Sequence, residues 1–231
     1  VSIAATGFLI HWLVFIPSAL FKTEKYYDIT GTIAYLFMTG LALYSLNELN
    51  FRSQVVAILI IVWAIRLGLF LLVRVFQVGE DKRFHAAKNS YLKFLMWFSI
   101  SALWVFLTTA NALTIILNNT ALKNDGYFYI GLIIWFIGFA FEVIADEQKR
   151  RFRNNPDNKG QFIMTGLWSI SRHPNYFGEI IEWIGWAIAT WSLAGLSFAV
   201  WVIANLVPRS RSNHQWYIEK FEEYPKDRKI L

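Results

Sequence analysis

The sequence contains no cysteine. This excludes disulfide bonds, thiolate nucleophiles and metal sites built on cysteine, and no metal site is predicted. The chain also has no G-x-G-x-x-G and no G-x-x-x-x-G-K-[ST] segment, which excludes the glycine-rich phosphate loops of soluble nucleotide-binding domains. Any nucleotide must therefore be held by side chains that project from the ends of helices.

Charged residues are also scarce. They make up 16% of the 231 residues, whereas hydrophobic residues make up 56% and aromatic residues 18%. This composition lies outside the range of soluble globular domains and indicates a membrane protein. Because lipid cannot satisfy free backbone groups, each crossing of the bilayer requires a helix of about 20 predominantly apolar residues.

Seven apolar segments are candidates for such helices, so the predicted fold is an all-α integral membrane protein with seven transmembrane helices. The segments are residues 1–21, 30–47, 54–77, 92–117, 127–145, 176–191 and 194–207. Only a short break at residues 191–195 separates the last two, which predicts a tight helical hairpin. No internal repeat or low-complexity linker interrupts the chain, and residues 1–231 are predicted to form one transmembrane domain.

Positive charge is distributed unevenly over the predicted loops. Eighteen of the 22 Lys and Arg residues fall on one side, Arg52 and Lys123 fall on the other, and Arg66 and Arg74 lie inside a span. Loops rich in Lys and Arg face the cytoplasm, so the C-terminus is predicted to be cytoplasmic. The same bias explains the net charge of +6. The expected partners are the lipid bilayer and a lipophilic small molecule, not nucleic acid.

Carboxylates lie at the end of the fifth predicted span, where burial in lipid would be costly. Glu142 and Asp146 stand four residues apart on one helical face, and Arg150 and Arg153 follow on the next turns. Residues at this spacing are neighbours on a helix surface. They fit either an ion-pair ladder on a solvated helix end or a site for a charged ligand.

A second carboxylate pair, Glu179 and Glu182, lies in the first two turns of the sixth predicted span. It follows the segment S-R-H-P-N-Y-F at residues 171–177. Two carboxylates three residues apart need a cationic or hydrogen-bonding partner. Arg172, Arg209 or His214 can supply it.

The last span and the C-terminal tail combine basic and aromatic residues. They fit an interfacial belt, or a nucleotide clamp in which guanidinium groups bind phosphates and rings stack on a base. The turn at residues 155–160 brings Lys159 to the same side. The segment at residues 22–28 also lies there, as a solvated hairpin or as part of a site. His11, alone in an apolar span, is interpreted as a hydrogen-bonded core residue.

Specific motifs lie between about residue 131 and residue 231. They are N-Y-F-G-E-I-I-E-W-I-G-W-A-I-A-T-W-S at residues 175–192 and F-E-E-Y-P-K-D-R-K at residues 221–229. In these motifs the chain resembles the C-terminal domain of the steroid 5-alpha-reductase family, and residues 145–160 and 171–175 resemble its bacterial branch. The resemblance implies a seven-helix membrane fold. Residues 1–125 would form the substrate side, and residues 126–231 would build an NADPH site that faces the cytoplasm.

The resemblance also implies roles for individual residues. Asp146, Arg150 and Arg153 would lie along the ribose and phosphates of NADPH, and Asn175 and Glu179 would hydrogen-bond its nicotinamide half. The other residues predicted to bind the cofactor are Arg83, Lys159, Arg172, Arg209, His214, Tyr217 and Arg228.

The N-terminal half departs from the family pattern. Steroid reductases carry a Q-E-L-P-S type segment whose Glu contacts the substrate carbonyl, and a Tyr three residues before an Arg; this chain has D-I-T-G at residues 28–31, and Trp63 before Arg66. The implied reaction is reduction of a carbon–carbon double bond conjugated to a carbonyl in a steroid or other lipid, with an acid polarising the carbonyl. A carboxyl in this role needs a raised pKa. The predicted catalytic residues are Asp28 and Glu24, assisted by Tyr26 or Tyr27.

Two alternatives come from other classes of protein. One is an S-adenosylmethionine-dependent membrane methyltransferase, because isoprenylcysteine carboxyl methyltransferases share a related helical core and an R-H-P-x-Y type motif. S-adenosylmethionine has no phosphate and carries a positive sulfonium, so it matches the arginines of the predicted clamp poorly. The other is a lipid-binding membrane scaffold, which leaves Glu179 and Glu182 without a purpose.

Overall fold

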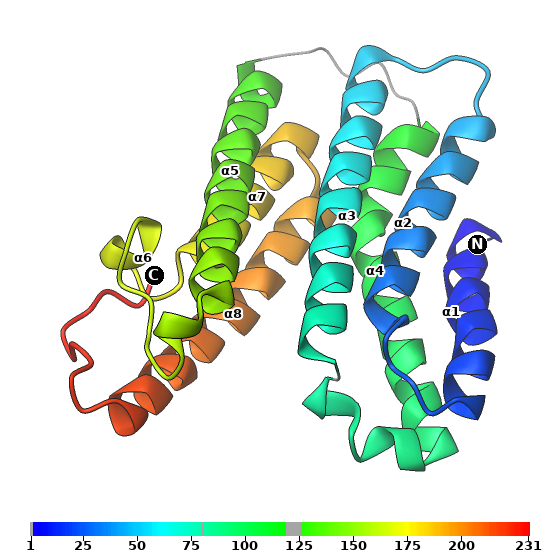
Figure 1. Ribbon diagram of the computed structural model, residues 1–231. Helices are drawn as coiled ribbons and strands as arrows, with labels where there is room; N and C mark the ends of the chain where they lie inside the picture. Colours follow the sequence, from blue (N-terminus) through cyan, green and yellow to red (C-terminus); the bar gives the residue numbers. More distant parts are fainter. Residues whose placement is uncertain (1, 80, 119–125) are drawn as a thin grey trace. The chain divides into compact units, whose positions relative to one another are not determined.

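The computed structural model describes residues 2–79, 81–118 and 126–231, and these residues form helices and no strand (Figure 1). The chain divides into two compact units. Unit 1 covers Val1–Lys123 and unit 2 covers Asn124–Leu231. The predicted boundary between a substrate half and a cofactor half, at residues 125 and 126, adjoins residues 119–125, which lie outside the described residues.

Unit 1 is a bundle of four long helices. They are α1 (Ser2–Leu20), α2 (Tyr27–Tyr44), α3 (Phe51–Val78) and α4 (Tyr91–Asn118). Helix α2 packs against each of the other three, and α4 also packs against α1 and α3. Asn50 caps α3 by accepting a hydrogen bond from the Ser53 N–H, which satisfies one of the free donors at the helix start.

Two short 3₁₀ helices, η1 (Lys82–Phe84) and η2 (Ala87–Asn89), connect α3 to α4. Phe84 anchors this connection because its ring is buried and packs against Tyr27 and Phe94. Phe15 of α1 and Phe98 of α4 complete the same aromatic cluster. The loop after α3 is thereby fixed to the ends of α1, α2 and α4.

Unit 2 contains three long helices. They are α5 (Gly126–Asn154), α7 (Pro174–Thr190) and α8 (Leu193–Lys220), with η3 (Pro156–Asn158) and the single turn α6 (Leu167–Ile170) between α5 and α7. Pro174 starts α7, where its fixed φ suits the first helical turn and its missing N–H leaves no bond unmade.

Glycines set the contact between α5 and α7. Gly131 and Gly138 lie seven residues apart on α5, and Gly178 and Gly185 lie seven apart on α7. A Cβ atom added at any of them would overlap backbone atoms of the opposite helix. Small residues are what allow two helix backbones to approach this closely.

The antiparallel register of this pair brings polar residues together at one end. The backbone of Glu142 on α5 lies against Gly178 on α7. One turn further along α5, Asp146 accepts a hydrogen bond of 3.2 Å from the Asn175 side chain. The glycine spacing therefore positions the carboxylates of α5 beside the first turns of α7.

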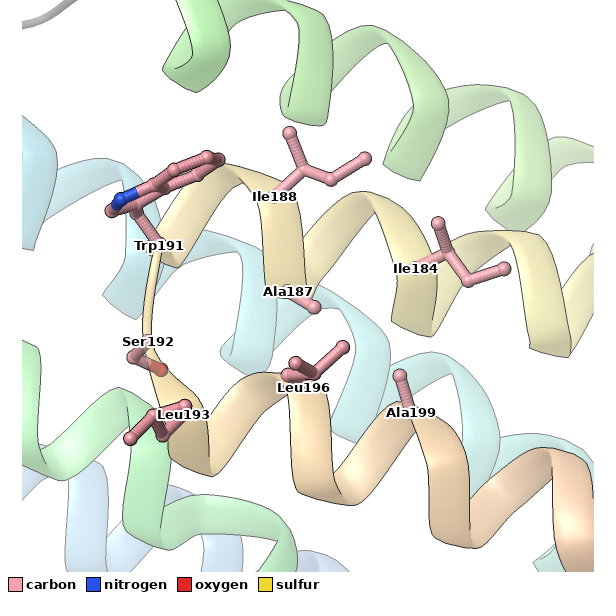
Figure 2. A pocket seen from close by; sticks show the side chains of 8 residues that line it. All are labelled: Ile184, Ala187, Ile188, Trp191, Ser192, Leu193, Leu196 and Ala199. Carbon is pink, nitrogen blue, oxygen red and sulfur yellow. The ribbon is translucent and has the colours of Figure 1, made fainter.

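The predicted hairpin between the last two spans is confirmed. Trp191 ends α7 in the left-handed region, at φ 47°, and the Ser192 side chain caps α8 by accepting from the Gly195 N–H at 3.0 Å. A cavity of about 410 Å³ lies beside this turn, between α7 and α8 (Figure 2). Its lining is almost wholly apolar, with Ser192 as the exception.

Five of the long helices are long and apolar enough to cross a membrane: α1, α3, α4, α5 and α8. Helices α2, with 18 residues, and α7, with 17 residues, match the second and sixth predicted spans. The count of seven crossings and the cytoplasmic C-terminus stay predictions. Helices α5 and α8 run beyond the predicted spans, to Asn154 and Lys220, because a helix can continue past the hydrocarbon once its side chains are solvated.

Candidate functional site

Unit 1 contains a cavity of about 380 Å³ among α2, α3 and α4. Much of its wall is apolar, with Leu67, Leu71 and Trp104 among the lining residues. Polar groups also line it, namely Tyr27, Asp28, Thr32, Tyr35, Arg83 and Ser101. An apolar pocket with a few polar groups is the usual form of a site for a small lipophilic molecule.

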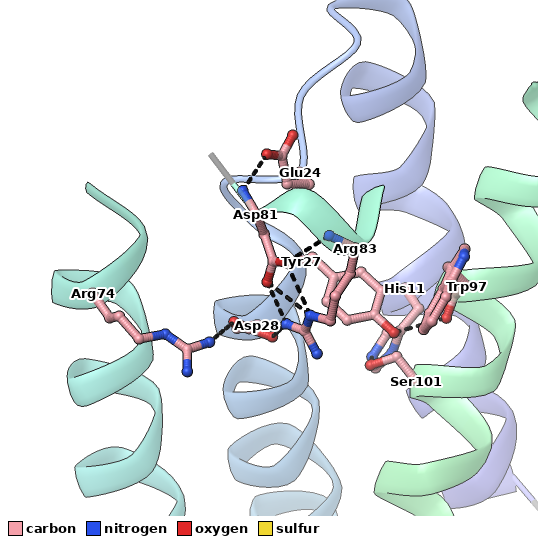
Figure 3. Close-up of polar contacts among 9 residues, drawn as sticks. All are labelled: His11, Glu24, Tyr27, Asp28, Arg74, Asp81, Arg83, Trp97 and Ser101. Carbon is pink, nitrogen blue, oxygen red and sulfur yellow. Dashed lines mark hydrogen bonds and ion pairs between the residues drawn. The ribbon is translucent and has the colours of Figure 1, made fainter. Parts of the chain in front are cut away.

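Asp28 is one of the predicted catalytic residues, and it lies in this cavity between two arginines. Its carboxylate is 3.6 Å from Nη2 of Arg74 and 3.9 Å from Nη2 of Arg83 (Figure 3). Arg74 was recognised in the sequence as a cation inside a span, but no partner was predicted for it. The structure supplies that partner.

Glu24, the other predicted acid, has a different position. It is 4% exposed, and its carboxylate accepts from the Asp81 N–H at 2.8 Å and pairs with Lys88 Nζ at 2.8 Å. Burial raises its pKa, but Lys88 and the Asp81 N–H more than offset this, so the pKa of Glu24 is lowered. That direction is opposite to the one required of a proton donor.

The two predicted tyrosines also differ. Tyr26 is half-exposed, whereas Tyr27 is buried, lines the cavity and donates its hydroxyl to the Trp97 carbonyl at 3.0 Å. The cavity thus brings together Asp28 and Tyr27 of the predicted catalytic group. Glu24 lies at the loop that carries Arg83.

Ser101 was not predicted as a site residue. It lines the cavity, and its Oγ lies 3.2 Å from Nε2 of His11, whose Nδ1 is 2.7 Å from the Gly7 carbonyl. The carbonyl requires a proton on Nδ1, so Nε2 accepts from the serine hydroxyl. His11 is fully buried, which agrees with its interpretation as a hydrogen-bonded core residue. A serine in an apolar span gives no sequence signal for such a contact.

The polar end of unit 2 is built around a loop between α5 and α7. The side-chain carbonyl of Gln148 accepts from the Leu167 N–H at 2.9 Å, and the buried Trp168 donates to the Ala145 carbonyl at 2.9 Å. Gly166 precedes this turn with φ 61°, a conformation that favours glycine. These contacts hold the start of α7 against the end of α5.

The C-terminal tail binds to the same loop. The Arg172 N–H donates to the Lys229 carbonyl at 2.8 Å, and Arg228 donates to the carbonyls of Ile163 and Ser171 at 3.3 and 3.2 Å. The Arg172 side chain is 1% exposed, and its guanidinium lies 3.3 Å from the centre of the Tyr217 ring. Three residues of the predicted clamp, Arg172, Tyr217 and Arg228, thus fasten the tail, the loop and α8 together.

His173 is a buried residue that the sequence did not single out as a ligand. Neither ring nitrogen has a hydrogen-bond partner within the described residues, and the ring stacks on Tyr176 at 4.6 Å. Burial, followed by the positive charges of Arg172 and Lys149, lowers its pKa to about 3. The ring is therefore neutral at physiological pH and offers one donor and one acceptor.

Other predicted cofactor residues lie at the same end of unit 2. The side-chain oxygen of Asn175 is buried and accepts no hydrogen bond in the part of the chain that the structure describes. Arg150 pairs with Glu147 at 2.7 Å. Arg153, Lys159 and Arg209 are exposed and form no ion pair with any described residue. His214 is buried and packs its ring against Tyr224.

Arg83 and Glu179 complete the predicted set. Glu179 lies on α7, one turn after Asn175, and is partly buried. Arg83 belongs to unit 1, where it lines the cavity and donates hydrogen bonds from Nε and Nη2 to the Asp81 carboxylate. Its predicted cofactor contact stays a prediction. Within residues 2–79, 81–118 and 126–231, no cluster of His, Asp and Glu could hold a metal ion.

Comparison with known proteins identifies relatives of this chain. It is 43% identical over 107 residues to the steroid 5-alpha-reductase DET2 of Arabidopsis thaliana, which covers 45% of this chain and 40% of that protein. It is 47% identical over 114 residues to DET2 of Solanum lycopersicum, covering 47% and 44%. It is 41% identical over 104 residues to the mouse 3-oxo-5-alpha-steroid 4-dehydrogenase 1, covering 45% and 41%.

These matches span less than half the length of the curated relatives. They confirm the resemblance to steroid 5-alpha-reductases that the motifs predicted, and they give the methyltransferase alternative no support. A family model described as "Protein of unknown function (DUF1295)" matches residues 14–210, which is most of the chain. The chain therefore belongs to the DUF1295 family.

Proposed function

We propose that the chain is an integral membrane reductase that uses NADPH to reduce a carbon–carbon double bond conjugated to a carbonyl in a steroid or another lipid. The names of the relatives support the reaction, since they state reduction of a steroid and a 3-oxo group on it. The cavity of unit 1 supports the lipid substrate. The polar end of unit 2 would bind the cofactor and face the cytoplasm.

The residues of unit 2 fit such a cofactor. Arg153, Lys159 and Arg209 have no ion-pair partner in the described residues, and exposed cations of this kind bind phosphates. His173 and Asn175 carry buried polar atoms without hydrogen-bond partners, and a carboxamide could satisfy them because it has both a donor and an acceptor. When bound, the nicotinamide supplies the hydride.

The chain's own residues would orient the two reactants. Asp146 accepts from the Asn175 amide, so the amide oxygen of Asn175 is turned away from Asp146 and can accept from a ligand. In unit 1 the apolar wall excludes water from the lipid, and Asp28 and Tyr27 remain the candidates that deliver a proton. Glu24 supports the loop that carries Arg83.

The observation that carries this proposal is that the chain combines an apolar cavity in unit 1, lined by a carboxylate and a tyrosine, with exposed cations in unit 2 that form no ion pair with any described residue. The test is incubation of the purified protein in detergent or nanodiscs with NADPH and progesterone, a steroid with a conjugated 3-oxo group. Mass spectrometry should find a product heavier by H₂, with one deuterium incorporated from deuteride-labelled NADPH. Tighter binding of S-adenosylmethionine than of NADPH, with no reduction, would refute the proposal.

A further inference from the structure

Arg83 lies on η1 and lines the cavity of unit 1 beside Asp28. We propose that Arg83 is a catalytic residue that donates a hydrogen bond to the carbonyl oxygen of a neutral enone lipid. The inference deepens the proposed function and rests on it. It moves Arg83 from the predicted cofactor group to the substrate.

Asp81 holds the guanidinium of Arg83 in place and leaves some of its N–H donors unused. Its Nε lies 3.0 and 2.8 Å from the two Asp81 carboxylate oxygens, and its Nη2 lies 2.5 Å from Oδ2 (Figure 3). Within the part of the chain that the structure describes, Nη1 makes no hydrogen bond. A guanidinium held on one edge by a carboxylate offers its other edge to an acceptor, and here that acceptor can be a ligand in the cavity.

A buried residue fixes the loop that carries this arginine. Glu24 accepts from the Asp81 N–H and pairs with Lys88, each at 2.8 Å, so it ties both ends of the segment Asp81 to Lys88 to the start of α2. Phe84, next to Arg83, is 1% exposed and packs against Tyr27. These two anchors leave Arg83 little freedom to move away from the cavity. Glu24 is thus a positioning residue for Arg83.

The charges around Arg83 favour a neutral ligand over an anion. Asp28 and Asp81 balance Arg74 and Arg83, so the cluster has no net positive charge to stabilise a carboxylate. An anionic headgroup at Nη1 would also be repelled by Asp28, whose carboxylate lies 3.9 Å from Nη2. A carbonyl oxygen needs only a donor and meets no such repulsion. The site therefore suits an oxo-lipid better than a fatty acid.

The same contact serves the reaction. When hydride adds to the β carbon, the electron pair of the double bond moves toward the carbonyl, and negative charge collects on the oxygen. Donors placed at that oxygen stabilise the charge. A proton then adds to the α carbon and the carbonyl is restored, so the net change is one hydride and one proton added to the double bond. Arg83 acts on the oxygen and supplies neither.

The experiment compares Arg83→Gln and Arg83→Lys with Arg74→Gln. Arg74 carries the other guanidinium at Asp28 but does not line the cavity. The probes are progesterone labelled with ¹³C at its 3-oxo carbon and, as the anion, palmitate. Isotope-edited infrared spectra of the bound ketone should show a lowered C=O stretching frequency in the wild-type protein. Arg83→Gln should reverse this shift and weaken progesterone binding at least tenfold.

The controls distinguish an effect on substrate binding from an effect on cofactor binding. We expect Arg83→Lys to fall between wild type and Arg83→Gln, Arg74→Gln to weaken progesterone binding threefold at most, and all variants to bind NADPH within twofold of wild type. Wild type should bind progesterone at least tenfold more tightly than palmitate.

Four outcomes would overturn the assignment of Arg83. The first is that Arg83→Gln raises the dissociation constant of NADPH and leaves progesterone binding unchanged. The second is that Arg83→Gln and Arg74→Gln weaken progesterone binding equally. The third and fourth are that the wild type binds palmitate more tightly than progesterone, or does not bind progesterone at all. Bound progesterone with the shifted C=O frequency but no reduction would instead refute the proposed function and leave Arg83 as the carbonyl ligand.

Discussion

The two units place their polar residues in contrasting ways. In unit 2 they come from a few continuous stretches, mainly residues 142–153, 171–179 and the C-terminal tail, and hydrogen bonds to backbone groups hold these stretches and the loop between them together. In unit 1 the polar residues of the cavity are scattered over α2, η1 and α4, one or two at a time. Continuous stretches are visible in a sequence as motifs, whereas scattered residues become a site only after folding.

The contrast extends to what the arginines do. In unit 2, the side chains of Arg172 and Arg228 contact the loop, the tail and α8, whereas Arg153 and Arg209 are exposed and form no ion pair with any described residue. In unit 1, Arg74 and Arg83 both face the Asp28 carboxylate. An arginine in a motif is therefore not by itself a ligand-binding residue.

The largest expected effect concerns the glycine contact that aligns unit 2. A methyl group at Gly138 would overlap the backbone of Glu182, so Gly138→Ala must push α5 and α7 apart. We expect a loss of about 3 kcal/mol in the free energy of unfolding, measured as thermal unfolding in detergent, with NADPH binding lost as well. Gly126→Ala is the matched control on the same helix, because no atom of the described residues lies within 4 Å of its added Cβ. Equal effects of both variants would contradict the close contact.

The second prediction concerns Arg228, which the sequence assigned to the cofactor. Arg228→Met removes two hydrogen bonds to backbone carbonyls, and bonds from a charged donor contribute about 2 kcal/mol in total. Limited proteolysis should cut the tail of this variant faster than that of wild type, even without nucleotide. Lys226→Ala, an exposed change in the same tail, should have no effect. If the tail resists proteolysis and only NADPH binding weakens, Arg228 contacts the cofactor directly.

Apolar length and a short break were sufficient to predict most of the fold. The described residues form seven long helices that overlap the predicted segments, and the hairpin at residues 191–192 forms where the apolar run is interrupted. Contacts that depend on tertiary register could not be predicted in this way. The hydrogen bond between Asp146 and Asn175 joins residues 29 positions apart and depends on the glycines of α5 and α7.

The candidate site of unit 1 shows the same limit more strongly. The segment containing Asp28 was identified, but its arginine partners lie 46 and 55 residues away in sequence. Glu24 was predicted as a candidate acid together with Asp28, and that role stays a prediction. Its partner Lys88 comes from a loop whose path the sequence does not reveal. The sequence therefore did not indicate that Asp28, of these two carboxylates, lines the cavity.

The third prediction tests Glu24 through pH. Its pKa in the folded protein lies below the ordinary value of 4.5, so its contribution to stability is fully present above about pH 4.5 and is lost as the pH falls through the lowered folded pKa. Glu24→Gln should lower the free energy of unfolding by about 2 kcal/mol at neutral pH and flatten the acid limb of the melting-temperature curve. Glu147→Gln, which breaks ion pairs with Arg150 and Arg151 that solvent screens, is the control and should lower the free energy of unfolding less than Glu24→Gln does.

The smallest expected effect separates two arginines on adjacent turns of α5. Arg150 is paired with Glu147 through Nε and Nη2, so a phosphate must compete with a carboxylate for it, whereas Arg153 is exposed and forms no ion pair with any described residue. Arg153→Ala should raise the NADPH dissociation constant about fivefold, equivalent to about 1 kcal/mol, and Arg150→Ala less than twofold. Tryptophan-quenching titrations with NADPH and NADH measure both effects. If Arg150→Ala raises the dissociation constant of NADPH more than Arg153→Ala does, Glu147 positions Arg150 for the phosphate. An ion pair with a carboxylate would then not exclude an arginine of unit 2 from binding the cofactor.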